Sequence, residues 1–87
     1  MSITRADFLR LLPAAVAHQP FSVEGERIGH RDVDRSWTIR LRAMPDLRIG
    51  LVRLERHQVV LAFEGYGEEE IAAFMRRFEL YFRRGGG

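Results

Sequence analysis

The sequence predicts a two-layer α+β domain with an N-terminal helix, an antiparallel meander of four or five strands, and a C-terminal amphipathic helix. Apolar residues recur with helical spacing at both ends of the chain and with a period of two between them. The links between the predicted strands are too short for a parallel crossover. The 87 residues suffice for one domain, which we assign to residues 1–84, with residues 85–87 as a flexible glycine tail.

The N-terminal helix is predicted to begin at Thr4 and to be closed by Gln19-Pro20. Thr4 is a capping residue, and Asp7 three positions later completes a short variant of the capping box. Pro13 removes a hydrogen bond inside the segment, so we expect it to kink the helix or to restart it. The apolar residues at helical spacing are Phe8, Leu11, Leu12 and Ala15.

The middle of the chain changes to a period of two, which is typical of strands. Glu24-Gly25 predicts a tight turn between two short strands. The clearest strand covers residues 37–43, where Trp37 begins an apolar face and Arg40 and Arg42 project from the other face.

Further strands complete the predicted meander. Pro45 within residues 44–47 predicts a turn, because its fixed φ suits the second position of a turn. Residues 48–55 and 57–64 are then two more strands, joined near Arg56. Because these links are short, we expect every pair of neighbouring strands to be antiparallel.

The C-terminal helix is predicted over residues 68–84. Three glutamates occupy its first turn and Arg83 and Arg84 its last turn, as the helix dipole favours, and Gly85 follows as a cap. The apolar residues fall on one stripe, so we assign the aromatic rings to the core rather than to an RNA-stacking surface. That stripe comprises Ile71, Phe74, Met75, Phe78, Tyr81 and Phe82.

The charge balance argues against a dedicated polyanion binder. Fourteen basic residues, all arginine, stand against twelve acidic residues, which leaves a formal net charge of +2. The chain has no cysteine, which excludes disulfides and thiolate chemistry. Charged residues interrupt the first apolar stretch, where a secretion signal would be apolar, so we expect a cytoplasmic protein with no membrane partner.

No residue pattern points to catalysis, and we expect no enzyme activity, no cofactor and no metal site. His30, Asp32 and Asp34 alternate, but an extended strand would place the first and last roughly 13 Å apart, too far to bind one ion. The segment from Gly65 to Gly67 lacks the third glycine of a dinucleotide-binding loop, and the glutamates that follow would repel a pyrophosphate.

The last two predicted strands carry apolar residues on both faces, whereas a half-solvated antiparallel sheet has one polar face. Either the two helices cover opposite faces, or one face binds a partner. We therefore predict a small interaction module or accessory subunit that forms a homodimer or binds another protein through this face. The predicted interface residues are Val52, Leu54, Val60, Ala62 and Leu80.

Weak nucleic-acid binding is the alternative function that the sequence leaves open. The strand residues that would contact phosphates are Arg40, Arg42, Arg48 and Arg53. The two functions differ in their response to salt, because phosphate contacts weaken steeply with ionic strength and apolar association does not.

Overall fold

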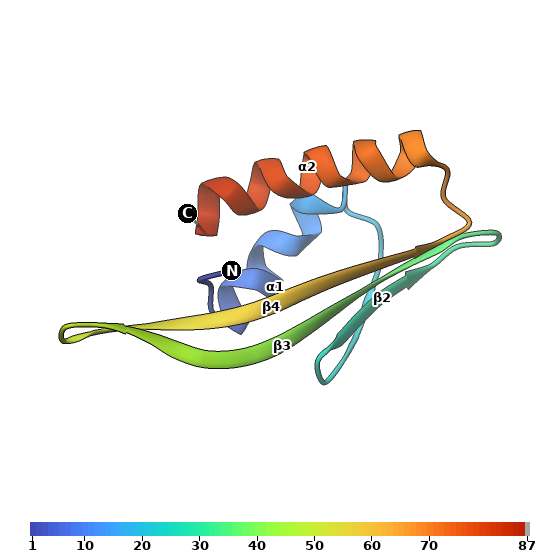
Figure 1. Ribbon diagram of the computed structural model, residues 1–87. Helices are drawn as coiled ribbons and strands as arrows, with labels where there is room; N and C mark the ends of the chain where they lie inside the picture. Colours follow the sequence, from blue (N-terminus) through green and yellow to red (C-terminus); the bar gives the residue numbers. More distant parts are fainter. Residues whose placement is uncertain (87) are drawn as a thin grey trace.

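The computed structural model describes residues 1–86 and confirms the predicted α+β arrangement of helix, four-stranded antiparallel meander and helix (Figure 1). The strands lie in the sheet in the order β1-β2-β3-β4, so each pairs with its neighbour along the chain. The elements are α1 (Arg5–Ala15), β1 (Ser22–Glu24), β2 (Arg27–Arg31), β3 (Ser36–Ile49), β4 (Val52–Glu64) and α2 (Glu68–Gly86).

The two helices begin as their sequences predict. The Thr4 hydroxyl accepts a hydrogen bond from the backbone N–H of Asp7 at 3.1 Å, which caps α1. α1 is continuous through Pro13, so the helix does not restart there. α2 extends to Gly86, two residues beyond the predicted end, and Gly87 of the predicted tail lies outside the described residues. Within residues 1–86 no helix is long and apolar enough to cross a bilayer.

Both helices pack on the same face of the sheet, which we call the inner face (Figure 1). The Phe8 ring of α1 lies 4.6 Å from the Phe82 ring of α2, centroid to centroid, and the Trp37 ring of β3 lies 5.7 Å from Phe74. Within residues 1–86, the opposite face of the sheet, the outer face, carries no helix. The buried sheet residues of the core are Ile28, Trp37, Ile39 and Leu41.

The predicted stripe of α2 faces the core. Phe78 and Phe82 are buried, and the other four stripe residues are half-buried. The prediction that these aromatic rings belong to the core is therefore confirmed. Arg77 also joins the two helices, because its Nε donates to the carbonyl oxygen of Ala14 at 2.8 Å.

The structure corrects the predicted turn at residues 44–47. β3 runs through this segment to Ile49, and the hairpin turn lies at Gly50 and Leu51. Gly50 has φ of 61°, a conformation that glycine adopts without a steric penalty. The two strands predicted at residues 48–55 and 57–64 are consequently wrong, because residues 52–64 form the single strand β4.

A β-bulge replaces the predicted turn. Two residues of β3, Pro45 and Asp46, stand opposite the single residue Glu55 of β4. β2 pairs with β3 only as far as Arg40, so no third strand requires the N–H that Pro45 lacks. Arg56 holds the bulge, because its Nε and Nη2 both donate to the carbonyl oxygen of Pro45 at 3.1 Å.

The first residues of the chain pack against β4. The backbone N–H of His57 donates to the carbonyl oxygen of Met1 at 2.9 Å, and the His57 Nδ1 lies 2.8 Å from the carbonyl oxygen of Ile3. His57 is buried, and the Nδ1 contact gives its ring a hydrogen-bond partner. On the far side of His57 from the core, the β3–β4 hairpin extends beyond the part of the sheet that the helices cover.

Candidate functional site

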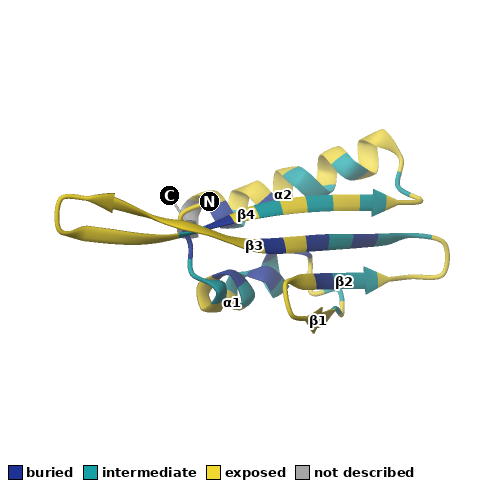
Figure 2. Ribbon diagram, turned by 60° about the horizontal axis from the view of Figure 1, so that its bottom comes forward, coloured by how far each residue is buried: buried dark blue, intermediate teal, exposed yellow. Residues whose placement is uncertain are grey.

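The end of the β3–β4 hairpin projects beyond both helices as an arm, which we define as residues 44–56 (Figure 1). Nearly every residue of the arm is exposed, and Figure 2 shows this along its length. Two strands alone are marginally stable in water, so such an arm gains from a binding partner. The molecule is correspondingly elongated, with extents of 48 × 25 × 19 Å.

One side of the arm is apolar, and the bulge produces this arrangement. Paired residues of an antiparallel ladder point to the same side. Leu47 pairs with Leu54 and Ile49 pairs with Val52, so all four side chains share one side. Their exposures range from 36% for Leu47 to 62% for Ile49. We call these four residues the arm cluster.

The bulge is needed because the apolar residues of the arm are at odd positions on β3 and at even positions on β4. In a regular β3 strand Leu47 and Ile49, at odd positions, would share a face with Ile39 and Leu41 of the core. The extra residue at the bulge reverses the alternation, so that they join Leu54 instead. The apolar residues at both parities are thereby divided among the core, the arm and, at Val60 and Ala62, the outer face of the sheet.

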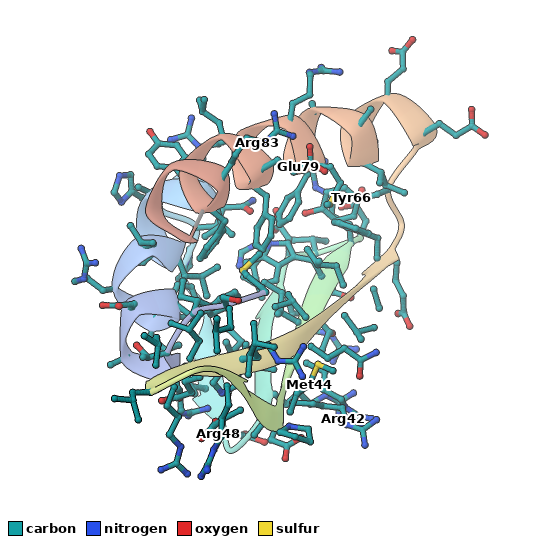
Figure 3. The ribbon with its side chains drawn as sticks, turned by 60° about the vertical axis from the view of Figure 1, so that its left-hand side comes forward. Arg42, Met44, Arg48, Tyr66, Glu79 and Arg83 are labelled. Carbon is teal, nitrogen blue, oxygen red and sulfur yellow. The ribbon has the colours of Figure 1, made fainter. Side chains whose placement is uncertain are left out.

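The opposite side of the arm is charged. Arg48 pairs with Arg53 across the ladder, and the Arg53 Nε lies 2.6 Å from an Asp46 carboxylate oxygen. Figure 3, which looks toward the arm, shows Arg42 and Met44 on one side of the hairpin and Arg48 on the other. The arm is thus amphipathic, with Arg48 and Arg53 on the side opposite the arm cluster and Arg56 at the base of the cluster.

The solvent-accessible surface is larger than a compact monomer requires. It measures 6172 Å², whereas a compact monomer of 10.1 kDa exposes about 5,300 Å². The excess of about 900 Å² is close to the roughly 800 Å² that each partner buries in a standard protein interface. The radius of gyration of 13.9 Å likewise exceeds the value of about 12 Å for a compact chain of this length.

The outer face of the sheet forms a second exposed surface, arranged in rows across the strands. One row consists of small residues, because Ser22, Gly29, Thr38 and Ala62 are aligned by register on the four strands. Two adjoining grooves of about 370 Å³ and 340 Å³ lie over this row and share Thr38 among their lining residues. We call this row and its grooves the trough.

Arginines flank the trough on both sides. Arg27 and Arg40 are register partners on one side, with Arg42 one row further along, and Arg31 lies on the other side. Among the described residues, no carboxylate oxygen lies within 4.0 Å of these four guanidinium groups. The trough therefore combines a floor of small side chains with exposed cations that form no ion pair within 4.0 Å among the described residues.

Four of the five predicted interface residues lie at alternate positions of β4 and so share one side of that strand, but at different points along it. Val52 and Leu54 belong to the arm cluster, whereas Val60 and Ala62 lie on the outer face beside the trough. Leu80 is 53% exposed on α2, on the other side of the sheet. Leu47 and Ile49 of the same surface are not predicted from the sequence, because Pro45 indicates a turn where the bulge lies.

The four arginines of the nucleic-acid alternative do not form one surface. Arg40 and Arg42 lie on the outer face near the trough. Arg48 and Arg53 lie on the charged side of the arm, beyond the bulge, and Arg53 already has an acidic partner.

His30 and Asp32 of the discounted metal motif each have a different hydrogen-bond partner. The His30 Nδ1 lies 2.6 Å from the carbonyl oxygen of Pro20, and its ring stacks against Trp37. An Asp32 carboxylate oxygen accepts from the N–H of Val33 at 2.7 Å. Within the described part of the chain, no group of three His, Cys, Asp or Glu residues is arranged to hold a metal ion.

Comparisons of the chain with protein-family models, with curated proteins and with solved structures give no match.

Proposed function

We propose that this protein is a small non-enzymatic interaction module that associates with a second copy of itself through the arm cluster. The observation that carries the proposal is the segregation produced by the bulge, which gathers Leu47, Ile49, Val52 and Leu54 on one uncovered side. Burial of exposed apolar area of this kind is the main driving force for protein association.

A second copy fits this surface because the arm cluster is self-complementary. A two-fold dimer brings the same patch of both subunits together, so any charge in the patch would face like charges in its copy. The four residues of the arm cluster are uncharged, and Arg48 and Arg53 lie on the other side of the arm. Arg56, at the base of the cluster, already donates to the Pro45 carbonyl oxygen. Two arms can therefore pack through these four residues without burying Arg48 or Arg53, and the guanidinium of Arg56 keeps its hydrogen bonds.

The area supports the same proposal. The surface exceeds that of a compact monomer by about the amount that one partner buries in a standard interface. Packing of two arms would also convert a marginal two-stranded ribbon into a four-stranded layered structure. A role as an accessory subunit in the cytoplasm is consistent with such a module.

The test is the molar mass in solution, measured by light scattering on a sizing column over a range of concentrations at low and high salt. We expect a dimer whose stability is unchanged or increased at high salt, because salt does not screen apolar contacts. A monomer at every concentration would refute the proposal, and a dimer that dissociates on addition of salt would replace the apolar contact with an ionic one.

A further inference from the structure

The trough on the outer face has a chemistry that the proposed self-association does not use. Thr38 in the trough and Leu47 in the arm cluster are nine positions apart on β3, which corresponds to roughly 25–30 Å. We infer that the trough binds a compact dianion, namely the phosphate group of a phosphorylated small molecule.

The floor of the trough permits close approach. Gly29 has no side chain, and its neighbours in the row are Ser22, Thr38 and Ala62. The hydroxyls of Ser22, Ser36 and Thr38 line the two grooves and can donate to phosphate oxygens. Grooves of about 370 Å³ and 340 Å³ are within the size range of small-ligand sites.

The walls of the trough supply the positive charge. Arg27 faces Arg40 directly across the β2–β3 ladder. Arg31 lies in the row on the other side of the trough, and Arg42 lies in the row next to the Arg27–Arg40 pair. Like charges directly opposite each other destabilise a sheet, and neither guanidinium forms an ion pair within 4.0 Å among the described residues. Guanidinium groups bind phosphate by paired hydrogen bonds, so a bound phosphate would relieve this repulsion.

Two carboxylates limit the length of the anion. Glu24 is the register partner of Arg27 at the β1 edge, and Glu64 is the partner of Ser36 at the β4 edge. Four arginines against two glutamates leave a surplus of two positive charges, which a phosphate monoester balances. A polyanion running along the trough would pass a glutamate at each end, which disfavours nucleic acid.

An apolar group attached to the phosphate also has a surface to contact. Val60 shares a row with Arg40, and it is 46% exposed. Ala62, the next outer-face residue of β4, extends this apolar strip. A phosphate monoester with a small apolar group should therefore bind more tightly than inorganic phosphate.

The test is a titration followed by the backbone amide NMR signals of Gly29 and Thr38. The probe is phenyl phosphate, with inorganic phosphate and phenol titrated in parallel at constant ionic strength. We expect saturable shifts at both residues with phenyl phosphate, weaker binding of inorganic phosphate, and no saturable shift with phenol. Arg40→Gln should weaken phenyl phosphate binding about tenfold or more, because it removes a charge-assisted contact.

Arg48→Gln is the matched control, since it removes the same charge from the far side of the arm. It should change the affinity less than twofold, as expected for a distant screened charge. Arg40→Gln should also leave the melting temperature unchanged or raise it, because it removes a like-charge pair. That combination separates loss of a binding group from loss of the fold.

Three results would overturn the inference. The first is an absence of saturable shifts at Gly29 and Thr38 with phenyl phosphate. The second is an equal loss of affinity in the Arg40→Gln and Arg48→Gln proteins, which would indicate general charge attraction. The third is tighter binding of a single-stranded oligonucleotide with a steep salt dependence, which would identify a polyanion surface.

Discussion

Leu47 and Leu54 face each other across the arm, in register, although a bulge lies between them and the pair formed by Met44 and Arg56. The pairing brings two leucines from different strands to one uncovered side of a hairpin that no helix supports (Figure 2). A pair of leucines in this position contributes little to the stability of a monomer. Self-association would bury this pair of leucines, and so it accounts for their exposed position.

Leu54→Glu is expected to abolish self-association while leaving the fold intact. Leu54 is 38% exposed, so a glutamate there remains hydrated in the monomer but would be buried without a partner in a dimer. Light scattering measures the mass, and circular dichroism checks the fold. The matched control is Leu80→Glu on α2, which should leave the dimer unchanged. If Leu54→Glu unfolds the chain, the leucine belongs to the core and the assignment of arm sides is inverted.

Phe78→Ala is expected to lower the free energy of unfolding by roughly 3–5 kcal/mol, as large-to-small changes in a core do. Phe78 is 3% exposed, and its ring centroid lies 4.5 Å from that of Phe82 and 6.3 Å from that of Phe8. Denaturant-induced unfolding measures the change. An unaltered unfolding midpoint would mean that the stripe of α2 does not face the core.

Gly65→Ala is expected to destabilise the fold more than Gly50→Ala. Both glycines have positive φ, 77° and 61°, where a side chain costs about 1–3 kcal/mol. A Cβ on Gly65 would in addition lie 2.3 Å from the Asp34 carbonyl oxygen, whereas one on Gly50 meets no atom within 4 Å. Thermal unfolding of the two variants measures the difference. Equal losses would show that Gly65 does not pack against the β2–β3 loop.

Gln19→Ala is expected to cost about 1–3 kcal/mol, because it leaves a buried donor without a partner. The Trp37 Nε1–H donates to the Gln19 side-chain oxygen at 3.0 Å, and Trp37 is 1% exposed. Gln58→Ala, at an exposed position on β4, is the control and should change stability by less than about 0.5 kcal/mol. The fluorescence of Trp37 reports unfolding in both proteins. Equal stability of the two variants would count against this hydrogen bond.

The sequence predicts the parts of the fold that local signals determine. The cap at Thr4, the stripe around Phe78 and the alternation from Trp37 onward all depend on residues within a few positions of one another. The placement of both helices on one face depends on contacts such as that between Phe8 and Phe82, which are distant in sequence. Periodicity identifies an apolar face but not the element that covers it.

The arm was missed in part because proline has two common roles. Pro45 indicates a turn from the sequence alone, but a strand edge at a bulge also accommodates proline. Gly50 is the residue that forms the turn, but Pro45, five positions earlier, is also typical of turns. The trough was missed for a related reason, since the alignment of Gly29, Thr38 and Ala62 depends on strand register, which the sequence alone does not provide.

The distance between two spin labels tests the arm-mediated dimer most directly. The chain has no cysteine, so Leu51→Cys at the tip of the arm and Leu80→Cys on α2 each provide one labelling site per subunit. Because the arms would lie at the two-fold axis and the helices far from it, pulsed electron paramagnetic resonance should give a shorter distance between subunits for the arm label than for the helix label. A helix-label distance equal to or shorter than the arm-label distance, or no coupling between arm labels, would contradict association through the arm.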